Sequence, residues 1–238
     1  MKTVIISFIN LISMTLYAQD DSSQWDIAKL NTGQAASYLS PLEKEVLLEL
    51  NKARSNPKLY ANLYIEPMLR YFDGKLDTRN NIETNEGVKA VKDCIAQLKR
   101  TAKMDLLSPD QELSKAALRH TSQQSKTRET GHDSPNGETF EYRLRKIKFS
   151  NTAECISYGE SEARGIVVSL LVDDGVPSRG HRNIILNPRY SSVGIAAGSH
   201  KVYSNMCTID FGGGTSGGVI SIRPDKRPIT DYLLPITF

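Results

Sequence analysis

Cysteine is scarce in this sequence, and its spacing argues against two classes of protein. The 238 residues include three cysteines, Cys94, Cys155 and Cys207, and none has the CxxC spacing of thiolate zinc sites or thioredoxin-like redox centres. An exported chain could pair two of them. An odd count then leaves one thiol free or paired between chains, and the sequence does not choose which.

Several catalytic and nucleotide-binding motifs are also absent. The chain contains no HExxH, GxSxG or GxxxxGK[ST] pattern, so zincin metalloproteases, serine hydrolases and P-loop nucleotide-binding proteins lack support. Cys155 could act as a nucleophile with His181, but no neighbouring feature indicates an activated thiol. We therefore assign no catalytic residue from the sequence.

Strong charge imbalance and long apolar runs are missing as well. A net charge of +3 with well-mixed signs does not indicate a nucleic-acid partner. No segment has the roughly 20 consecutive apolar residues of a transmembrane helix, so we expect no membrane span. With 39% hydrophobic and 24% charged residues, the composition is that of an ordinary globular protein.

The first 18 residues have the pattern of a secretory signal peptide. Lys2 supplies the positive start, residues 4–16 are largely apolar, and Ala18 is a small residue before the polar run that follows. We interpret residues 1–18 as a signal peptide and expect a secreted protein, either extracellular or periplasmic.

Helical patterns come first in the chain and strand patterns last. Residues 19–39 are polar and contain the only tryptophan, Trp25. We expect this leader to be loosely held. Ser40-Pro41-Leu42-Glu43 predicts a capping box that opens a helix ending near Asn56. A mostly helical insertion at about residues 66–100 surrounds a polar loop at 73–85.

A second capping box at residues 108–111 is predicted to open a helix that carries His120. Alternating apolar residues then predict strands at 193–197 and 203–211. The order of elements predicts an α+β fold, or a three-layer α/β/α sandwich. Residues 214–238 form a C-terminal extension.

The four histidines fall into two groups. His120 lies near the apolar side of its helix, which favours a hydrogen-bonded structural histidine, and His200 lies in a turn where we expect an exposed side chain. His132 and His181 each follow a glycine in a polar loop. Because imidazole is a common ligand of divalent metals and a common acid or base, these two are the candidate site residues.

Acidic residues near these histidines are the second requirement of such a site. Asp173 and Asp174 end a predicted helix at residues 161–174, where the helix dipole favours cations. Glu154 has apolar neighbours, so its carboxylate must be exposed, paired or hydrogen-bonded.

Several segments, taken in order, resemble the CAP domain of cysteine-rich secretory proteins, antigen 5 and pathogenesis-related proteins, and most closely its bacterial secreted (SCP-like) branch. The block GHRNIILNP is the most specific of them. The resemblance covers roughly residues 41–213 and is carried by EVLLELNKARSNP, LSPDQELSKAALRHTSQQ, TGHDSPNGETFEYRL, AECISYG and SLLVDDGVPSRGHRNIILNPRYSSVGIAAG.

The resemblance implies an α/β/α sandwich at residues 40–213, with two histidines and two acids in one cleft. By motif these are His132, Glu154, Asp174 and His181, and the histidines are the expected ligands of Zn²⁺ or another divalent cation. Two departures stand out. Ala153-Glu154-Cys155 replaces the family's GEN motif, and the second acid is an aspartate, a role for which Asp173 competes.

Three functions remain open at this point. The first is a secreted metal-binding module for an unknown extracellular or cell-envelope ligand, either a lipid or a protein. The second is a metal-assisted hydrolase, peptidase-like, with Glu154 as general base. The third is a purely structural cell-envelope interaction protein, in which the four residues form only hydrogen bonds.

Overall fold

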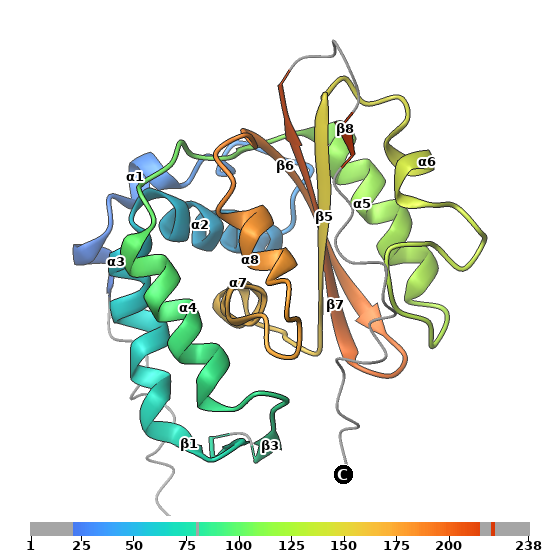
Figure 1. Cartoon of the computed structure of the whole chain (residues 1–238). Coiled ribbons are helices and arrows are strands. Elements are labelled where there is room, and N and C mark those ends of the chain that lie inside the picture. The colour runs from blue at the N-terminus through green and yellow to red at the C-terminus, as the bar shows by residue number, and fades with distance from the viewer. Residues whose placement is uncertain (1–20, 80, 215–219, 222–238) are drawn as a thin grey trace, which may run out of the picture.

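The computed structural model of the chain describes residues 21–79, 81–214 and 220–221 (Figure 1). The predicted signal peptide at residues 1–18 lies outside the described residues. So does most of the predicted C-terminal extension, of which only Gly214, Ile220 and Ser221 are described.

A five-stranded sheet forms the centre of the molecule, in the order β4-β6-β7-β5-β8. The three long strands β6, β7 and β5 are antiparallel to one another, and the short strands β4 and β8 pair in parallel with β6 and β5. The strands are β4 (Ser108–Pro109), β5 (Asn151–Tyr158), β6 (Ser192–His200), β7 (Ser204–Gly213) and β8 (Ile220–Ser221).

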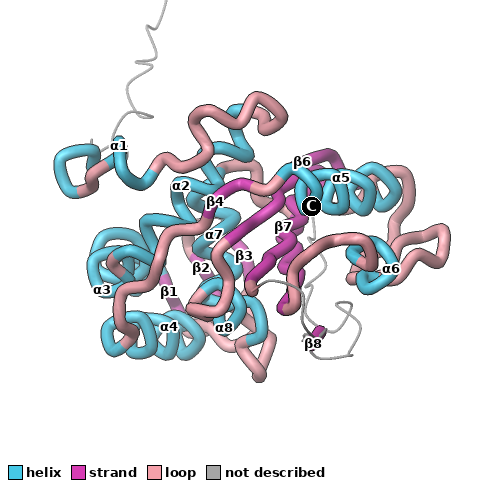
Figure 2. Tube along the Cα trace, turned by 90° about the horizontal axis from the view of Figure 1, so that it is seen from above, coloured by secondary structure: helices cyan, strands magenta, loops and turns pink. Residues whose placement is uncertain are grey.

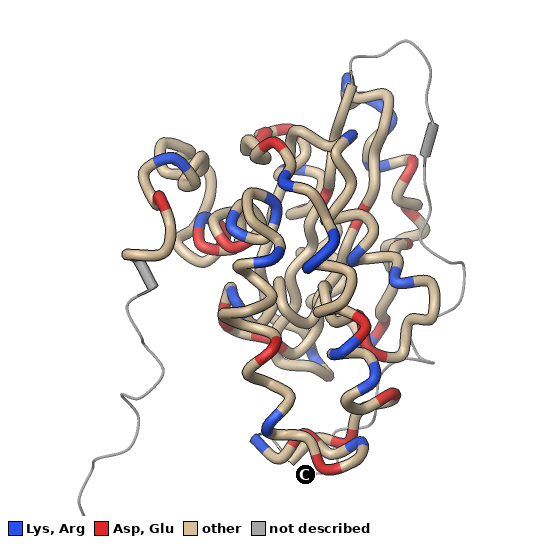
Figure 3. Tube along the Cα trace, turned by 60° about the vertical axis from the view of Figure 1, so that its left-hand side comes forward, with Lys and Arg blue, Asp and Glu red and all other residues tan. Residues whose placement is uncertain are grey.

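Helices cover both faces of this sheet, which confirms the predicted three-layer architecture (Figures 1 and 2). The helices on one face are α5 (Gln111–Gln124) and α6 (Phe140–Leu144). Those on the other include α2 (Pro41–Ser55), α7 (Ala163–Val172) and α8 (Gly180–Ile185). Acidic and basic residues are interspersed along the trace (Figure 3).

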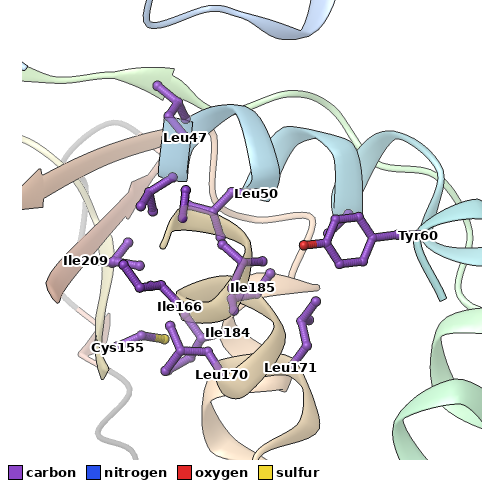
Figure 4. Close-up of a cluster of buried hydrophobic side chains, with 14 of the residues drawn as sticks. Leu47, Leu50, Tyr60, Cys155, Ile166, Leu170, Leu171, Ile184, Ile185 and Ile209 are labelled. Atoms are coloured by element: carbon purple, nitrogen blue, oxygen red, sulfur yellow. The ribbon is translucent and has the colours of Figure 1, made fainter. Parts of the chain in front are cut away.

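The larger hydrophobic core lies on the side of the sheet that α2, α7 and α8 cover. Leu50, Ile166 and Ile185 from these helices pack in one cluster with Cys155 and Ile209 of the sheet (Figure 4). A smaller cluster on the opposite face joins α5 to α6. The buried faces of these helices therefore hold the layers together.

The two predicted capping boxes have different outcomes. At α2 the Ser40 hydroxyl accepts from the Glu43 amide and Glu43 accepts from the Ser40 amide, which confirms the first. The second, at residues 108–111, is wrong because Ser108 and Pro109 form strand β4. Asp110 caps α5 instead, and its carboxylate accepts from the amides of Glu112 and Leu113.

The leader at residues 19–39 is not loosely held where the structure describes it, from residue 21 onward. Trp25 is buried, and its indole donates to the Tyr64 hydroxyl at 2.8 Å while its ring packs edge-on against Tyr60. Leu30 and Leu39 are also buried. The expectation was wrong because apolar anchors, and not the average polarity of the segment, decide how it packs. The leader contains the short helices η1 (Asp21–Gln24) and α1 (Ile27–Leu30).

The insertion at residues 66–100 is helical at both ends and forms a small sheet between them. The polar loop expected at 73–85 consists of turns joined by two-residue strands, which pair as a small antiparallel sheet in the order β1-β2-β3. The elements between residues 57 and 100 are α3 (Pro57–Tyr60) and η2 (Ala61–Ile65), which precede the insertion, and then η3 (Glu66–Tyr71), β1 (Phe72–Asp73), β2 (Leu76–Asp77), β3 (Ile82–Glu83) and α4 (Val88–Arg100). No helix within the described part of the chain is long and apolar enough to cross a membrane.

Candidate functional site

His132 lies in the loop between α5 and α6 and contacts the middle of strand β5. Its Nδ1 lies 2.8 Å from Oε1 of Glu154, whose side chain is fully buried. The other carboxylate oxygen of Glu154 accepts from Arg143 of α6 at 2.5 Å, and Arg143 also donates to the backbone oxygen of His132 at 2.7 Å. Both carboxylate oxygens of Glu154 are thus paired, and this pairing compensates for the burial of the charge.

The charges around Glu154 outweigh its burial. Burial alone would raise the pKa of this carboxyl, but the hydrogen bond from His132 and the positive charge of Arg143 lower it below its usual range. An ionised Glu154 is an acceptor only, so Nδ1 of His132 carries the proton that it donates. The second ring nitrogen, Nε2, is then left for another partner, on a side chain that is 23% exposed.

A buried polar network fixes the loop that carries His132. His120 of α5 is fully buried and contacts the Ser134 hydroxyl at 2.8 Å and the Gly131 oxygen at 3.0 Å. Gln124 donates to the same Gly131 oxygen at 2.7 Å. Burial lowers the pKa of His120 to about 4. The prediction of a hydrogen-bonded structural histidine at position 120 is therefore confirmed.

His200 was expected to be exposed, and that expectation is wrong. Its side chain is buried at the end of β6, with Nε2 2.9 Å from the backbone oxygen of Glu129. Its Nδ1 accepts from the backbone amides of Val202 and Tyr203, and these two hydrogen bonds stabilise the turn that follows β6. A histidine that ties a turn to a neighbouring loop has no sequence signature that separates it from an exposed one.

His181 lies in the first turn of α8 and forms the second histidine–carboxylate pair. Its Nδ1 lies 2.7 Å from Oδ1 of Asp173, and its backbone amide donates to Oδ2 of the same residue at 2.9 Å. Asp173 ends α7 in the left-handed conformation, with φ of 55°, and its carboxylate is buried. This arrangement again leaves Nε2 of the imidazole for another partner.

Asp174, the acid expected beside His181, makes different contacts. Its carboxylate accepts from the backbone amides of Asn85 at 2.7 Å and Glu86 at 2.9 Å, in the insertion. The left-handed turn at Asp173 sends the two consecutive side chains in different directions. Asp173 therefore takes the place that motif matching gave to Asp174.

The two pairs approach β5 from its two faces. Glu154 and Cys155 are consecutive strand residues and so point to opposite faces. Glu154 contacts His132, while the Cys155 thiol lies 3.9 Å from the backbone oxygen of His181. The two histidines are thus attached to neighbouring positions of one strand.

Each of the two histidines has a carboxylate partner on Nδ1. Metal-bound histidines commonly donate their other ring N–H to a carboxylate, as His132 and His181 do here. The two pairs do not fit a closed structural zinc site, which takes four protein ligands. Among the residues at 21–79, 81–214 and 220–221, no group of three or more His, Cys, Asp or Glu side chains is placed to hold a metal ion.

Asp210 is a buried acid of the site that the sequence analysis did not single out. It lies opposite Glu154 in the β5–β7 register, is fully buried, and neither carboxylate oxygen has a hydrogen-bond partner among the described residues. Burial, then the negative charge of Glu154, and then the proton that the two adjacent carboxyl groups can share raise the pKa of Asp210 well above its usual value. The strand pattern places residue 210 on one face of β7, but only the register brings it beside Glu154.

All three cysteines are buried and free. Burial raises the pKa of Cys94 to about 12 and shifts the pKa values of Cys155 and Cys207 upward as well. A buried thiol with a raised pKa is a poor nucleophile. Pairing of Cys155 with His181 in nucleophilic catalysis therefore has no support.

Comparisons with known proteins agree with this architecture. The family model CAP, described as the cysteine-rich secretory protein family, matches residues 49–211. No curated protein matches the chain.

Two solved structures are similar over part of the chain. One is an extracellular protein containing a SCP domain from Bacillus anthracis str. Ames, with 26% identity, a TM-score of 0.39, and coverage of 47% of this chain and 35% of that one. The other is an outer surface protein from Borrelia burgdorferi, with 22% identity, a TM-score of 0.39, and coverage of 46% and 79%. The match spans about a third of the Bacillus protein.

Proposed function

Because this chain belongs to the CAP family, the cysteine-rich secretory proteins, we propose that it is a secreted binding module in which His132 and His181 bind a divalent metal ion such as Zn²⁺. One observation carries the proposal: each imidazole uses Nδ1 to bond a buried carboxylate and keeps Nε2 for a ligand. The two side chains are 23% and 15% exposed, so an ion can reach them from solvent.

The carboxylates have an orienting role in this proposal. Glu154 and Asp173 fix the tautomer and the ring direction of His132 and His181, which lowers the entropy lost when Nε2 binds a metal. When bound, the ion supplies Lewis acidity and open coordination positions for water or for an oxygen-bearing ligand. With two protein ligands, affinity should be modest, and it should fall on acidification because only neutral imidazole binds metal.

A hydrolase that uses Glu154 as general base has less support from the geometry. Oε1 of Glu154 is engaged by His132 and Oε2 by Arg143, and the side chain is fully buried. A general base must reach the water that it deprotonates. A metal-assisted reaction at this site would therefore need a different base.

Calorimetric titration of the purified protein with Zn²⁺ tests the metal site. We expect one ion per chain, with binding weakened in His132→Ala and in His181→Ala and lost in the variant that carries both substitutions. His200→Gln is the control, since it replaces a histidine outside the pairs. Unchanged binding in the double variant would contradict the proposal, and would favour a structural role for both pairs and a search for cell-envelope partners.

Export is proposed from residues 1–18 and has its own test. If they are a signal peptide, protein recovered from the medium or periplasm should begin at Gln19, and deletion of residues 2–18 should keep the protein in the cytoplasm. Intact mass measurement distinguishes the two forms. Full-length protein retained in the cytoplasm would count against export.

A further inference from the structure

The loop that leads to His181 is docked on the insertion. Asp174 accepts from the amides of Asn85 and Glu86 through both of its carboxylate oxygens, and the amide of Gly175 donates to Oε1 of Glu86 at 3.0 Å. The approach is close, because a Cβ at Gly175, where φ is +76°, would lie 2.6 Å from Nδ2 of Asn85. Residues 85 and 86 thus contact the two residues that follow Asp173.

An ion pair extends this contact toward His181. Arg179 donates to both carboxylate oxygens of Glu86, at 2.6 and 2.7 Å, and to the backbone oxygen of Asp173 at 2.7 Å. It does so from the left-handed conformation, with φ of 50°. The hydrogen bond from Arg179 lowers the pKa of Glu86, so the pair stays ionised. Glu86 is therefore linked through one guanidinium to the residue that orients His181.

Helix α4 contacts Arg182, the residue that follows His181 in the chain. Oδ2 of Asp93 accepts from Arg179 at 3.1 Å and from Arg182 at 3.0 Å. Arg182 also donates to the side-chain oxygen of Gln97 at 3.1 Å and is itself fully buried. In Figures 1 and 2, α4 runs beside α8. Two arginines close to His181 in sequence are thus fixed by the same helix.

We propose that residues 85–97 of the insertion are the positioning element for His181: Glu86 and Asp93 hold Arg179 and Arg182, and so hold the loop and the Asp173 carboxylate that orient the imidazole. The inference deepens the proposed function, on which it rests for the role of His181 as a ligand. Glu86 and Asp93 are positioning residues, because each acts through an arginine and not on the ion. The insertion is thereby part of the site.

Hydrogen exchange, followed by mass spectrometry, tests the positioning in the full chain. In Glu86→Gln, exchange should become about tenfold faster in residues 173–183, with residues 129–138 and 151–158 unchanged. Glu66→Gln is the matched control: it removes a carboxylate in the same insertion that pairs with Lys99 at 2.8 Å, without contact to this loop. It should leave exchange in residues 173–183 unchanged.

A second variant and a second readout keep the outcomes separate. Asp93→Asn acts on a carboxylate whose side chain is 44% exposed and should give the same local pattern as Glu86→Gln. Zn²⁺ titration of both should show a Kd raised roughly three- to tenfold at unchanged stoichiometry. Unchanged exchange in residues 173–183 in both variants, or equal acceleration in every segment, would overturn the positioning role. Absence of zinc binding in the wild-type protein would overturn the proposed function, while exchange would still decide the positioning.

Discussion

The loops at residues 129–138 and 173–181 each contain a histidine–carboxylate pair, but different residues hold the two loops in place. In each, an imidazole donates from Nδ1 to a buried carboxylate. The first loop is held by buried groups of the sandwich itself, including His120 and Arg143. The second is held by partly exposed charges, chiefly Glu86 and Arg179, of which one belongs to the insertion.

This difference predicts different sensitivities. A buried polar network depends on every member being paired, since an unpaired group is costly in a low dielectric. A partly exposed ion pair contributes less, because solvent screens it and can replace either partner. Loss of one buried partner should therefore strongly destabilise the His132 loop, whereas loss of one charge should destabilise the His181 loop only slightly.

The largest effect is expected at Arg143. Arg143→Ala leaves the buried Glu154 carboxylate without its main counter-charge, which should lower the free energy of unfolding by about 3–5 kcal/mol. Urea denaturation measures it. Arg119→Ala, which removes a half-exposed partner of Glu138, is the control and should cost under about 1 kcal/mol. Equal losses in the two variants would contradict the contrast between buried and exposed support.

Acidification should weaken the two loops at different pH. The pKa of His120 is lowered from 6.5 to about 4, so its contribution to stability is full above pH 6.5 and is lost as pH falls toward 4. The whole window corresponds to about 3 kcal/mol. The pKa of Glu86 is lowered from 4.5, so its contribution is lost only below that pH.

Urea denaturation at pH 7 and pH 5 checks this sign. Because Asp210 contributes with the opposite sign in every variant, the comparison is between proteins. From pH 7 to pH 5 the free energy of unfolding should change less favourably in the wild-type protein than in His120→Gln, which has no imidazole to protonate. In Glu86→Gln it should change as it does in the wild-type protein. A pH slope that is the same in all three proteins would show that His120 is not the group responsible.

The smallest effect is expected at Asp210, and it has the opposite sign. The pKa of Asp210 is raised, so its contribution is full below its ordinary value of 3.8 and is lost as pH rises. Asp210→Asn should therefore stabilise the protein at pH 7 and give no gain near pH 4. Exposed Asp133→Asn is the control. Destabilisation at pH 7 would mean that an ionised Asp210 supports the site.

Local patterns in the sequence predicted an α+β fold or a three-layer sandwich, and the resemblance to the CAP domain selected the sandwich. The Ser40 capping box corresponds to α2, and the helical part of the predicted insertion includes α4. The error at Ser108 arose because a strand and a cap can share the same four residues. The error at the leader arose because Trp25 packs against Tyr60 and Tyr64, which follow it by more than 30 residues.

The site was predictable only in part. Glycine before each histidine singled out His132 and His181. The apolar neighbours of Glu154 predicted a carboxylate that is exposed, paired or hydrogen-bonded, and the structure shows it paired. Sequence could not choose between Asp173 and Asp174, because the choice depends on one left-handed residue. It also could not place Asp210 beside Glu154, or Glu86 beside Arg179, since strand register and docking are long-range properties.

X-ray absorption at the zinc edge, on protein loaded with one equivalent of Zn²⁺, tests the central claim most directly. It counts the imidazoles bound to the ion. The account predicts two imidazole ligands with oxygen at the remaining positions, and one imidazole in either His132→Ala or His181→Ala loaded at excess zinc. A spectrum with no imidazole, or one unchanged by both substitutions, would contradict it.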